Sequence, residues 1–100
     1  MGKDLTNAKE ELLRLLKNKA PMKCALINGN RLKLNYTEID LVEFLQKMDF
    51  DYDSGYGAQE LSGTIWLQDG TWCTRGEYDG SEWWNHNKLP EVPKELYKSF

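Results

Sequence analysis

Four carboxylates between residues 49 and 60 have the spacing of ligands in a calcium-binding loop. Asp49, Asp51, Asp53 and Glu60 occupy positions one, three, five and twelve of that segment, where oxygen atoms wrap a hard cation in helix–loop–helix sites. The match is incomplete, because position six is a serine and the glycine needed there comes one residue later. The residues that follow also have the pattern of a strand rather than a helix. The sequence therefore keeps calcium only as a weak candidate and favours an acidic recognition loop or a simple turn.

Acid–base and nucleophilic chemistry have little support in the sequence. His86 is the only histidine, and no nearby serine or cysteine stands in a recognised nucleophile motif. Glu77, Asp79 and Glu82 could supply paired carboxylates for hydrolysis, but acidic residues beside turn glycines are usually structural. A glycine-rich phosphate loop is also missing from the sequence. We therefore predict no catalytic residue and no cofactor, and a non-enzymatic protein is the favoured class.

Aromatic side chains are concentrated between residues 66 and 84, where four tryptophans and Tyr78 fall within nineteen positions. Successive side chains of a strand point to opposite faces, so Trp83 and Trp84 cannot both lie in one apolar core. One interpretation is a sheet buried on one side and shielded by loops on the other. The alternative is a partner-binding surface, with base stacking as a third use. The residues of the hypothetical binding surface, acidic loop included, are Asp49, Asp51, Tyr52, Asp53, Tyr56, Glu60, Trp66, Trp72, Tyr78, Trp83 and Trp84.

Two principal helices are expected among the elements that position these residues. The first, with Asp4 or Thr6 as its cap, must end before Pro21. The second begins with a capping box at Thr37 and ends near Asp49. Both have apolar residues at three- and four-residue spacing, which predicts helices that bury one face.

Short strands fill the rest of the predicted fold. The turn signals Asn28-Gly29-Asn30 and Asp69-Gly70 each join two strands into a hairpin. Strands are expected over residues 22–28, 31–36, 61–68, 71–75 and 82–86, a loop over 49–60, and a short helix after Pro93. The order is α-β-β-α-β-β-β-α. It predicts an α+β fold in which a small antiparallel sheet of two hairpin-connected groups carries the two principal helices on one face.

Length and composition predict one domain over residues 1–100. The formal net charge of −3 and the 40% of hydrophobic residues exclude a polycation and a disordered acidic tail. Cys24 and Cys73 lack the spacing of a zinc site or a disulfide scaffold, so we expect buried, reduced thiols. With no apolar leader and no run of about eighteen apolar residues, the sequence favours a cytosolic protein with no membrane partner.

The charge is distributed unevenly along the chain. Residues 1–33 carry eight basic and three acidic side chains, residues 38–60 carry one and seven, and residues 61–100 carry four and six. The acidic middle would steer a basic partner or imitate nucleic-acid phosphate, or it is an ordinary solvated helix face. The basic first third would contact phosphate, or it is the usual charge of a surface helix and an edge strand.

The C-terminal half contains a long and unusual sequence signature. Residues 52–66 read YDSGYGAQELSGTIW, and a W-x-x-D-G-x-W pattern, an E-Y-D-G-S-E-W-W run and a P-x-x-P tail follow. Over about residues 50–96 this resembles small uncharacterised proteins encoded by tailed bacteriophages and prophages. The resemblance implies a phage gene product in the bacterial host cytoplasm, and it implies no reaction and no catalytic residue. Phage accessory proteins of this size often bind and inhibit a host protein.

We therefore expect a non-enzymatic phage or prophage accessory protein that binds and modulates a host protein through the acidic loop and the aromatic sheet surface. The alternative is a nucleic-acid-binding protein that uses the basic N-terminal third and the aromatic residues. A calcium-binding module is the third hypothesis. The sequence leaves open the identity of the partner, the oligomeric state, and whether the acidic loop or the basic third is the working surface.

Overall fold

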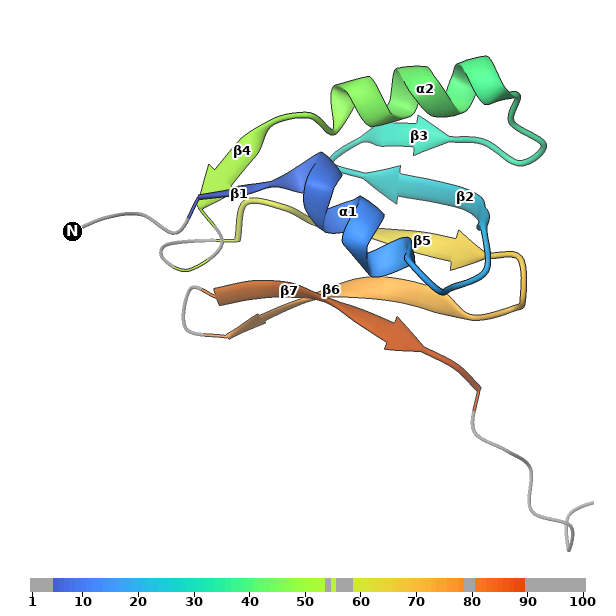
Figure 1. Cartoon of the computed structure of the whole chain (residues 1–100). Coiled ribbons are helices and arrows are strands. Elements are labelled where there is room, and N and C mark those ends of the chain that lie inside the picture. Colours follow the sequence, from blue (N-terminus) through green and yellow to red (C-terminus); the bar gives the residue numbers. More distant parts are fainter. Residues whose placement is uncertain (1–4, 54, 56–58, 79–80, 90–100) are drawn as a thin grey trace, which may run out of the picture.

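Two helices lie over one face of a five-stranded antiparallel sheet in the computed structural model (Figure 1). The structure describes residues 5–53, 55, 59–78 and 81–89. The strand order of this large sheet is β3-β2-β5-β6-β7, and a separate two-stranded ribbon joins β1 to β4. The elements are β1 (Leu5–Asn7), α1 (Ala8–Leu16), β2 (Met22–Ile27), β3 (Asn30–Leu32), α2 (Glu38–Lys47), β4 (Asp51–Asp53), β5 (Gly63–Leu67), β6 (Trp72–Tyr78) and β7 (Ser81–Asn87). The protein is a small α+β fold, as the sequence predicts.

Local turn chemistry forms the two predicted hairpins. Asn28 and Gly29, with φ angles of 48° and 82°, close the turn between β2 and β3. Gly70, with a φ angle of 88°, lies in the turn between β5 and β6. β3 ends at residue 32 rather than at the predicted residue 36. The backbone at Asn35 has a φ angle of 60°, which is incompatible with a regular strand.

Helix α1 begins at Ala8, one residue later than a cap at Thr6 would place it. Asn7 is the N-cap of α1, and its side chain accepts a hydrogen bond of 3.0 Å from the backbone N–H of Glu10. The prediction of Thr6 as the cap is therefore wrong, because Asn7 is the residue that caps the helix. Asp4, the other predicted cap, lies outside the described residues. The helix has Ala8 and Leu12 on its buried side.

The second helix begins as predicted. The hydroxyl of Thr37 accepts a hydrogen bond of 3.1 Å from the N–H of Asp40, and the Asp40 carboxylate accepts one of 2.9 Å from the N–H of Thr37. This reciprocal pair is the capping box that the sequence indicates. The helix ends at Lys47, with Met48 as the C-cap.

Pairing between β1 and β4 is the main departure from the predicted fold. Leu5 lies opposite Asp53, and Asn7 lies opposite Asp51. The first part of the predicted 49–60 loop is therefore a strand. Three-residue strands show no detectable periodicity, and their partners here are more than forty residues apart in the sequence, so no local pattern indicates them. The predicted helix after Pro93 lies outside the described residues.

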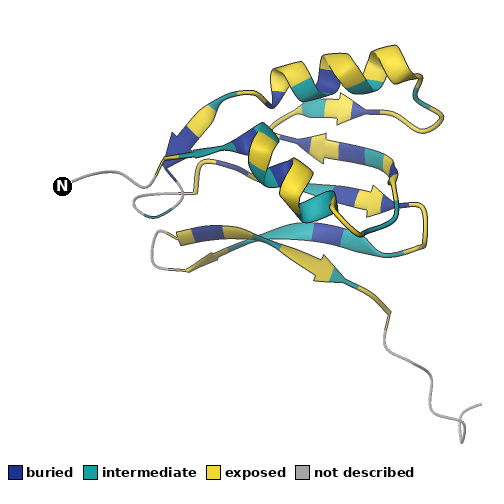
Figure 2. Ribbon diagram, in the orientation of Figure 1, coloured by how far each residue is buried: buried dark blue, intermediate teal, exposed yellow. Residues whose placement is uncertain are grey.

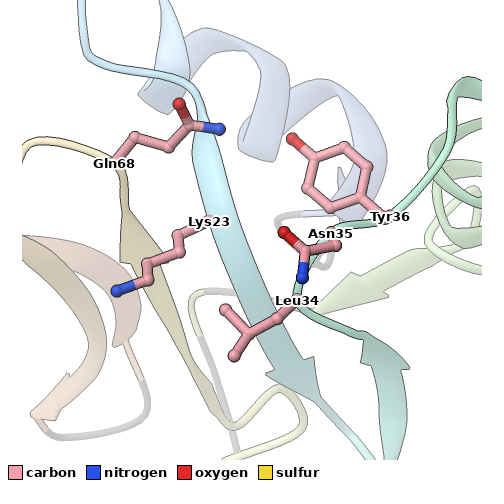
Figure 3. A pocket seen from close by; sticks show the side chains of 5 residues that line it. All are labelled: Lys23, Leu34, Asn35, Tyr36 and Gln68. Carbon is pink, nitrogen blue, oxygen red and sulfur yellow. The ribbon is translucent and has the colours of Figure 1, made fainter.

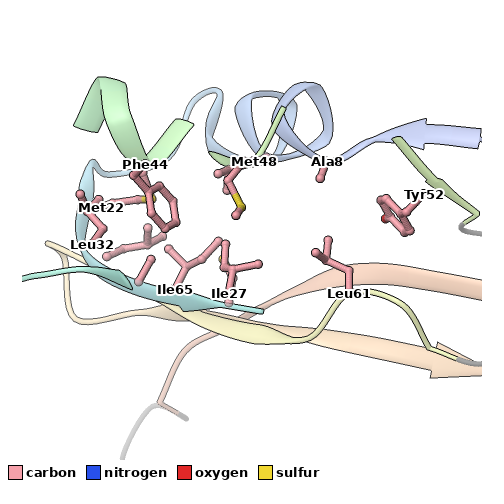
Figure 4. Close-up of a cluster of buried hydrophobic side chains, with 13 residues drawn as sticks. Ala8, Met22, Ile27, Leu32, Phe44, Met48, Tyr52, Leu61 and Ile65 are labelled. Carbon is pink, nitrogen blue, oxygen red and sulfur yellow. The ribbon is translucent and has the colours of Figure 1, made fainter. Parts of the chain in front are cut away.

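The apolar core fills the space between the helices and the large sheet (Figure 4). Leu12 of α1, Phe44 of α2 and Ile65 of β5 are all buried there. The outer sides of both helices are exposed (Figure 2). Cys73 is part of the core, and burial raises the pKa of its thiol, whereas Cys24 is only half-buried. The burial of both thiols is thus confirmed only for Cys73.

Candidate functional site

The face of the large sheet that points away from the helices carries several exposed aromatic side chains. Residues directly opposite one another on neighbouring strands share a face. One such line across the sheet runs Cys24, Trp66, Trp72 and Asn87, each paired with the next. Because Ile65 points into the core, the neighbouring Trp66 points away from it, and its exposed fraction is 42%. We call this side of the large sheet the open face.

A second line on the open face is polar and uncharged in its centre. It runs Leu26, Thr64, Thr74 and Asn85 across four strands. The side-chain amide of Asn87 donates a hydrogen bond of 3.0 Å to the Thr74 hydroxyl, which joins this line to the aromatic one. The open face thus presents indole rings beside hydroxyl and amide groups.

Trp83 lies flat on the open face because its cross-strand neighbour is a glycine. Gly76 is paired with Trp83, and a Cβ atom at Gly76 would lie 2.5 Å from the indole Nε1 of Trp83. The ring therefore occupies the space that a side chain would fill. Its Nε1–H donates a hydrogen bond of 3.0 Å to the side-chain oxygen of Asn85. These two contacts fix the orientation of a ring that is 39% exposed.

Two adjoining pockets lie on the open face beside Trp66. The smaller, of about 220 Å³, is lined by Lys23, Cys24, Leu34 and Trp66. The larger, of about 460 Å³, shares Lys23 and Leu34 with it and adds Asn35, Tyr36 and Gln68 (Figure 3). The Tyr36 hydroxyl donates a hydrogen bond of 2.7 Å to the backbone oxygen of Met22, which holds its ring at the pocket wall. Lys23 thus lies between an apolar pocket and an amide-lined one.

Charges are divided between the two sides of the molecule. Among the described residues, the open-face lines hold no Asp or Glu, and Arg31 extends the polar line because it is paired with Leu26. The described acidic residues of the sheet, Glu77 and Glu82, are paired with each other on the opposite side. Lys23 therefore makes the β2 part of the open face positive, whereas Arg31 lies at the sheet edge and also lines a pocket with Asp40 and Glu43 of α2.

The predicted acidic loop does not form one exposed surface. The side chains of Asp49 and Asp51 both accept hydrogen bonds from the Asn7 amide, at 3.0 and 3.1 Å, so they brace the start of α1. Tyr52 and Asp53 are buried, with exposed fractions of 3% and 7%. These two positions are corrections, because they are interior rather than available to a partner. Glu60 is exposed, and Tyr56 lies outside the described residues.

The calcium hypothesis finds no geometric support in the described part of the chain. Asp51 and Asp53 lie in β4, where the backbone is extended, instead of in a loop that wraps a cation. One Asp53 oxygen accepts a hydrogen bond of 3.1 Å from the N–H of Gly55. Within residues 5–53, 55, 59–78 and 81–89, no three His, Cys, Asp or Glu side chains gather as metal ligands would.

Trp84 is the second correction to the predicted binding surface. It packs against the core on the helix side of the sheet, opposite to Trp83, as the two-residue period of a strand requires. Its ring lies over the guanidinium of Arg75, whose Cζ is 4.9 Å from the ring centroid. Trp66, Trp72, Tyr78 and Trp83 remain as the aromatic residues of the open face.

A buried ion-pair cluster centred on Arg75 is the feature that sequence reasoning misses. The side chain of Arg75 is only 2% exposed, and that of Glu82 is fully buried. Arg75 donates hydrogen bonds of 3.0 Å to Glu82 and 2.8 Å to the Tyr52 hydroxyl, and it forms an ion pair of 3.3 Å with Glu11. One signal was available: Arg75 follows the buried Cys73 by two residues, so it points to the same side of β6.

The cluster holds one segment of backbone against the sheet. The Glu82 carboxylate accepts hydrogen bonds from the N–H groups of Glu60 and Leu61, at 2.6 and 3.0 Å. The Tyr52 hydroxyl is hydrogen-bonded to Glu11, and burial together with that bond raises the pKa of Tyr52 far above its usual range. Both Glu82 oxygens are thus paired and enclosed, so this cluster is structural rather than reactive.

An exposed chain of hydrogen bonds links Asp69, Thr71 and His86. The direction in which these hydrogen bonds are donated does not suit nucleophilic catalysis. The Thr71 hydroxyl is 2.6 Å from the Asp69 carboxylate, which can only accept, so the hydroxyl donates to it. His86 Nε2, 2.8 Å from the same hydroxyl oxygen, must therefore be the donor in that contact. An imidazole that donates to threonine is not placed to remove its proton. The chain instead stabilises the β5–β6 turn.

The chain was compared with protein-family models, with curated proteins and with solved structures. No protein-family model matches the chain, and neither curated proteins nor solved structures give a match. Neither helix of the described residues is long and apolar enough to cross a membrane.

Proposed function

We propose that the protein is a non-enzymatic accessory protein of a tailed phage or prophage, which binds and modulates a host protein in the bacterial cytoplasm through its open face. The observation that carries the binding site is the set of Trp66, Trp72 and Trp83 on one face that holds no described carboxylate. The phage origin and the cellular setting rest on the sequence signature of residues 50–96.

Exposed tryptophans on a rigid sheet have the chemistry of an interface centre. Indole rings supply a large contact area with few rotatable bonds, and aromatic residues dominate the energetic hot spots of protein complexes. Trp83 is held by Gly76 and Asn85, so binding would cost little side-chain entropy. The neighbouring hydroxyl and amide groups would hydrogen-bond at the polar rim.

The charge on the open face specifies the kind of partner. Lys23 borders both pockets, and Arg31 lies at the same end of the sheet. A complementary host surface has apolar side chains opposite the tryptophans and acidic side chains opposite these two cations. The acidic residues Asp49 and Asp51 are engaged with Asn7 beside α1 and are not required for this contact.

The test compares variants on the two sides of the molecule. Tagged wild-type protein, a Trp66→Ser/Trp83→Ser variant and an Ile39→Ser/Val42→Ser variant are used to capture proteins from nuclease-treated bacterial lysate. Ile39 and Val42 are exposed on α2, so the last variant removes a similar apolar surface from the helix side. A captured protein is then purified and titrated against all three by calorimetry.

We expect the tryptophan variant to bind the purified partner at least about tenfold more weakly, and the α2 variant to bind like wild type. Equal binding by all three proteins would exclude the open face as the contact. A lysate that yields no saturable partner at low or moderate salt would contradict the proposed function itself.

Single-stranded nucleic acid is the second candidate, favoured by the absence of Asp and Glu among the described residues of the open-face lines and of the two pockets that Lys23 borders. Bases would stack on the exposed indoles while Lys23 contacts phosphate. Fluorescence anisotropy with a labelled oligonucleotide of about twenty nucleotides tests this, because such binding weakens steeply as salt increases. Lys23→Ala and Trp66→Ser should each weaken it, and no binding at low salt would eliminate this candidate.

A further inference from the structure

β7 forms an edge of the large sheet with no described strand on its outer side. Each of its seven residues, from Ser81 to Asn87, is paired with a residue of β6 on the inner side. In an edge strand the remaining backbone N–H and C=O groups point outward and are available to another strand. β7 therefore presents a regular, seven-residue template for further pairing.

The opposite edge of the same sheet is protected. β3 has only three residues, and one of them is Arg31. Helix α2 packs along this strand (Figure 1). A short strand, a positive charge and a covering helix are all features that prevent edge-to-edge association. The two edges therefore differ in strand length, in basic charge and in the presence of a covering helix among the described residues.

β7 has no basic residue or proline of the kind that protects an edge strand. Its sequence, SEWWNHN, contains no lysine, arginine or proline. Glu82 is its only carboxylate, and that side chain is fully buried and paired with Arg75 at 3.0 Å. Apart from Glu82, the strand has no Asp, Glu, Lys or Arg, so β7 carries no exposed carboxylate or basic side chain of these types that would repel an identical strand.

We propose that β7 pairs with β7 of a second copy of this chain, antiparallel and about a two-fold axis. Most soluble homo-oligomers have such closed two-fold symmetry, in which the same surface is used by both copies. An axis perpendicular to the sheet would keep both open faces on one side and unite the two sheets. Trp83 of each copy would then lie near the junction, and the aromatic surface would continue across the dimer. This inference stands on the edge of the sheet and does not depend on the proposed host partner.

The expected dimer is weak. Edge pairing buries only backbone and a few side chains. The surface area buried in this way is smaller than the roughly 1,200–2,000 Å² of a stable protein interface. The two half-exposed Trp83 rings add apolar area at the junction. A dissociation constant of about 10–100 µM is therefore expected, and its measurement needs protein concentrations on both sides of that range.

Sedimentation equilibrium of the full chain from about 1 to 500 µM tests the association. The wild-type mass should rise from 11.7 kDa toward twice that value. A Ser81→Lys/His86→Lys variant places two charges on exposed positions of β7 and should weaken the dimer at least about tenfold. Val42→Lys/Gln46→Lys is the matched control, because it adds the same charges on the exposed side of α2.

Hydrogen exchange at low and high protein concentration locates the contact. Amides of residues 81–87 should exchange more slowly in the dimer, whereas those of α2 should not change. A protein that stays monomeric at every concentration would overturn the proposal, and so would a dimer that both lysine variants weaken equally. Protection outside β7, or growth into open-ended oligomers, would also exclude a two-fold pairing of this edge.

Discussion

The two faces of the large sheet reverse the usual distribution of side chains. On the helix side, the charged groups of Arg75 and Glu82 are almost completely enclosed. On the open face, Trp66 and Trp83 expose about 40% of their surface. Residue type alone therefore does not decide burial in this protein. The register of each strand decides which face a side chain joins, and the two helices decide which face is covered.

The same comparison separates stability from binding. The buried cluster has satisfied hydrogen bonds and holds residues 60 and 61 to the sheet, so it contributes to the fold. The open-face tryptophans contribute less to the fold because much of their apolar surface still faces water. Substitutions on the two faces should therefore have different effects on the free energy of unfolding and on partner binding.

Removal of Arg75 should have the largest effect on stability. Arg75→Ala would leave the carboxylate of Glu82 buried without its cation, which is expected to cost about 3–5 kcal/mol of unfolding free energy. Urea denaturation followed by tryptophan fluorescence measures this change. Since the variant could fail to fold, Arg75→Met/Glu82→Gln serves as a second test. It removes both charges and should recover part of the loss. A loss below about 1 kcal/mol for Arg75→Ala would show that the cluster is unimportant for the fold.

Ile65 and Trp66 compare the two faces within one strand. Ile65 is fully buried, so Ile65→Ala should lower the unfolding free energy by about 2–5 kcal/mol. Trp66→Ala removes a larger side chain from the open face and should cost no more than about 1 kcal/mol. Chemical denaturation of both variants gives the two values directly. If Trp66→Ala were the more destabilising, the open face would be part of the structural core.

Sequence patterns predict the features of this fold that are set by near neighbours. The turns at Gly29 and Gly70, the capping box at Thr37 and the opposite orientation of Trp83 and Trp84 all follow from local rules. The layer of the molecule to which each segment belongs is a long-range property. For this reason the sequence suggests one joint surface of acidic loop and aromatic sheet, whereas Asp51 lies in the β1–β4 ribbon and Trp66 on the open face.

The burial of the ion-pair cluster could be predicted only in part. The two-residue period places Arg75 and Cys73 on the same side of β6, and Cys73 is apolar enough to indicate the core. The single cation comes from β6, and the two carboxylates that meet it come from α1 and β7. Their meeting depends on how α1 crosses the sheet, and helix–sheet packing leaves no local signal in the sequence.

Gly76 offers a finer test, because it changes the open face without entering the core. In Gly76→Ala the new Cβ would overlap the Trp83 indole, so the ring must leave its position. Loss of the Trp83–Asn85 hydrogen bond and of this packing should cost about 1 kcal/mol, with a red-shifted and more readily quenched tryptophan emission. Thr74→Ala, on the same strand and face, is the control and should leave Trp83 in place. Unchanged quenching in Gly76→Ala would mean that the glycine does not position the ring.

The smallest expected effect concerns the exposed turn between β5 and β6. Hydrogen bonds from the Thr71 hydroxyl and backbone hold the pKa of Asp69 below its usual value. A lowered pKa in the folded state adds stability above the unfolded-state pKa, and this stability is lost as the pH falls through the folded-state pKa. Thr71→Val removes the hydroxyl and should move the Asp69 pKa back toward its usual value, as measured by carboxyl NMR titration. It should also flatten the acid dependence of stability, whereas Thr64→Val on the open face should change neither. An Asp69 pKa unaffected by Thr71→Val would show that the backbone N–H alone sets it.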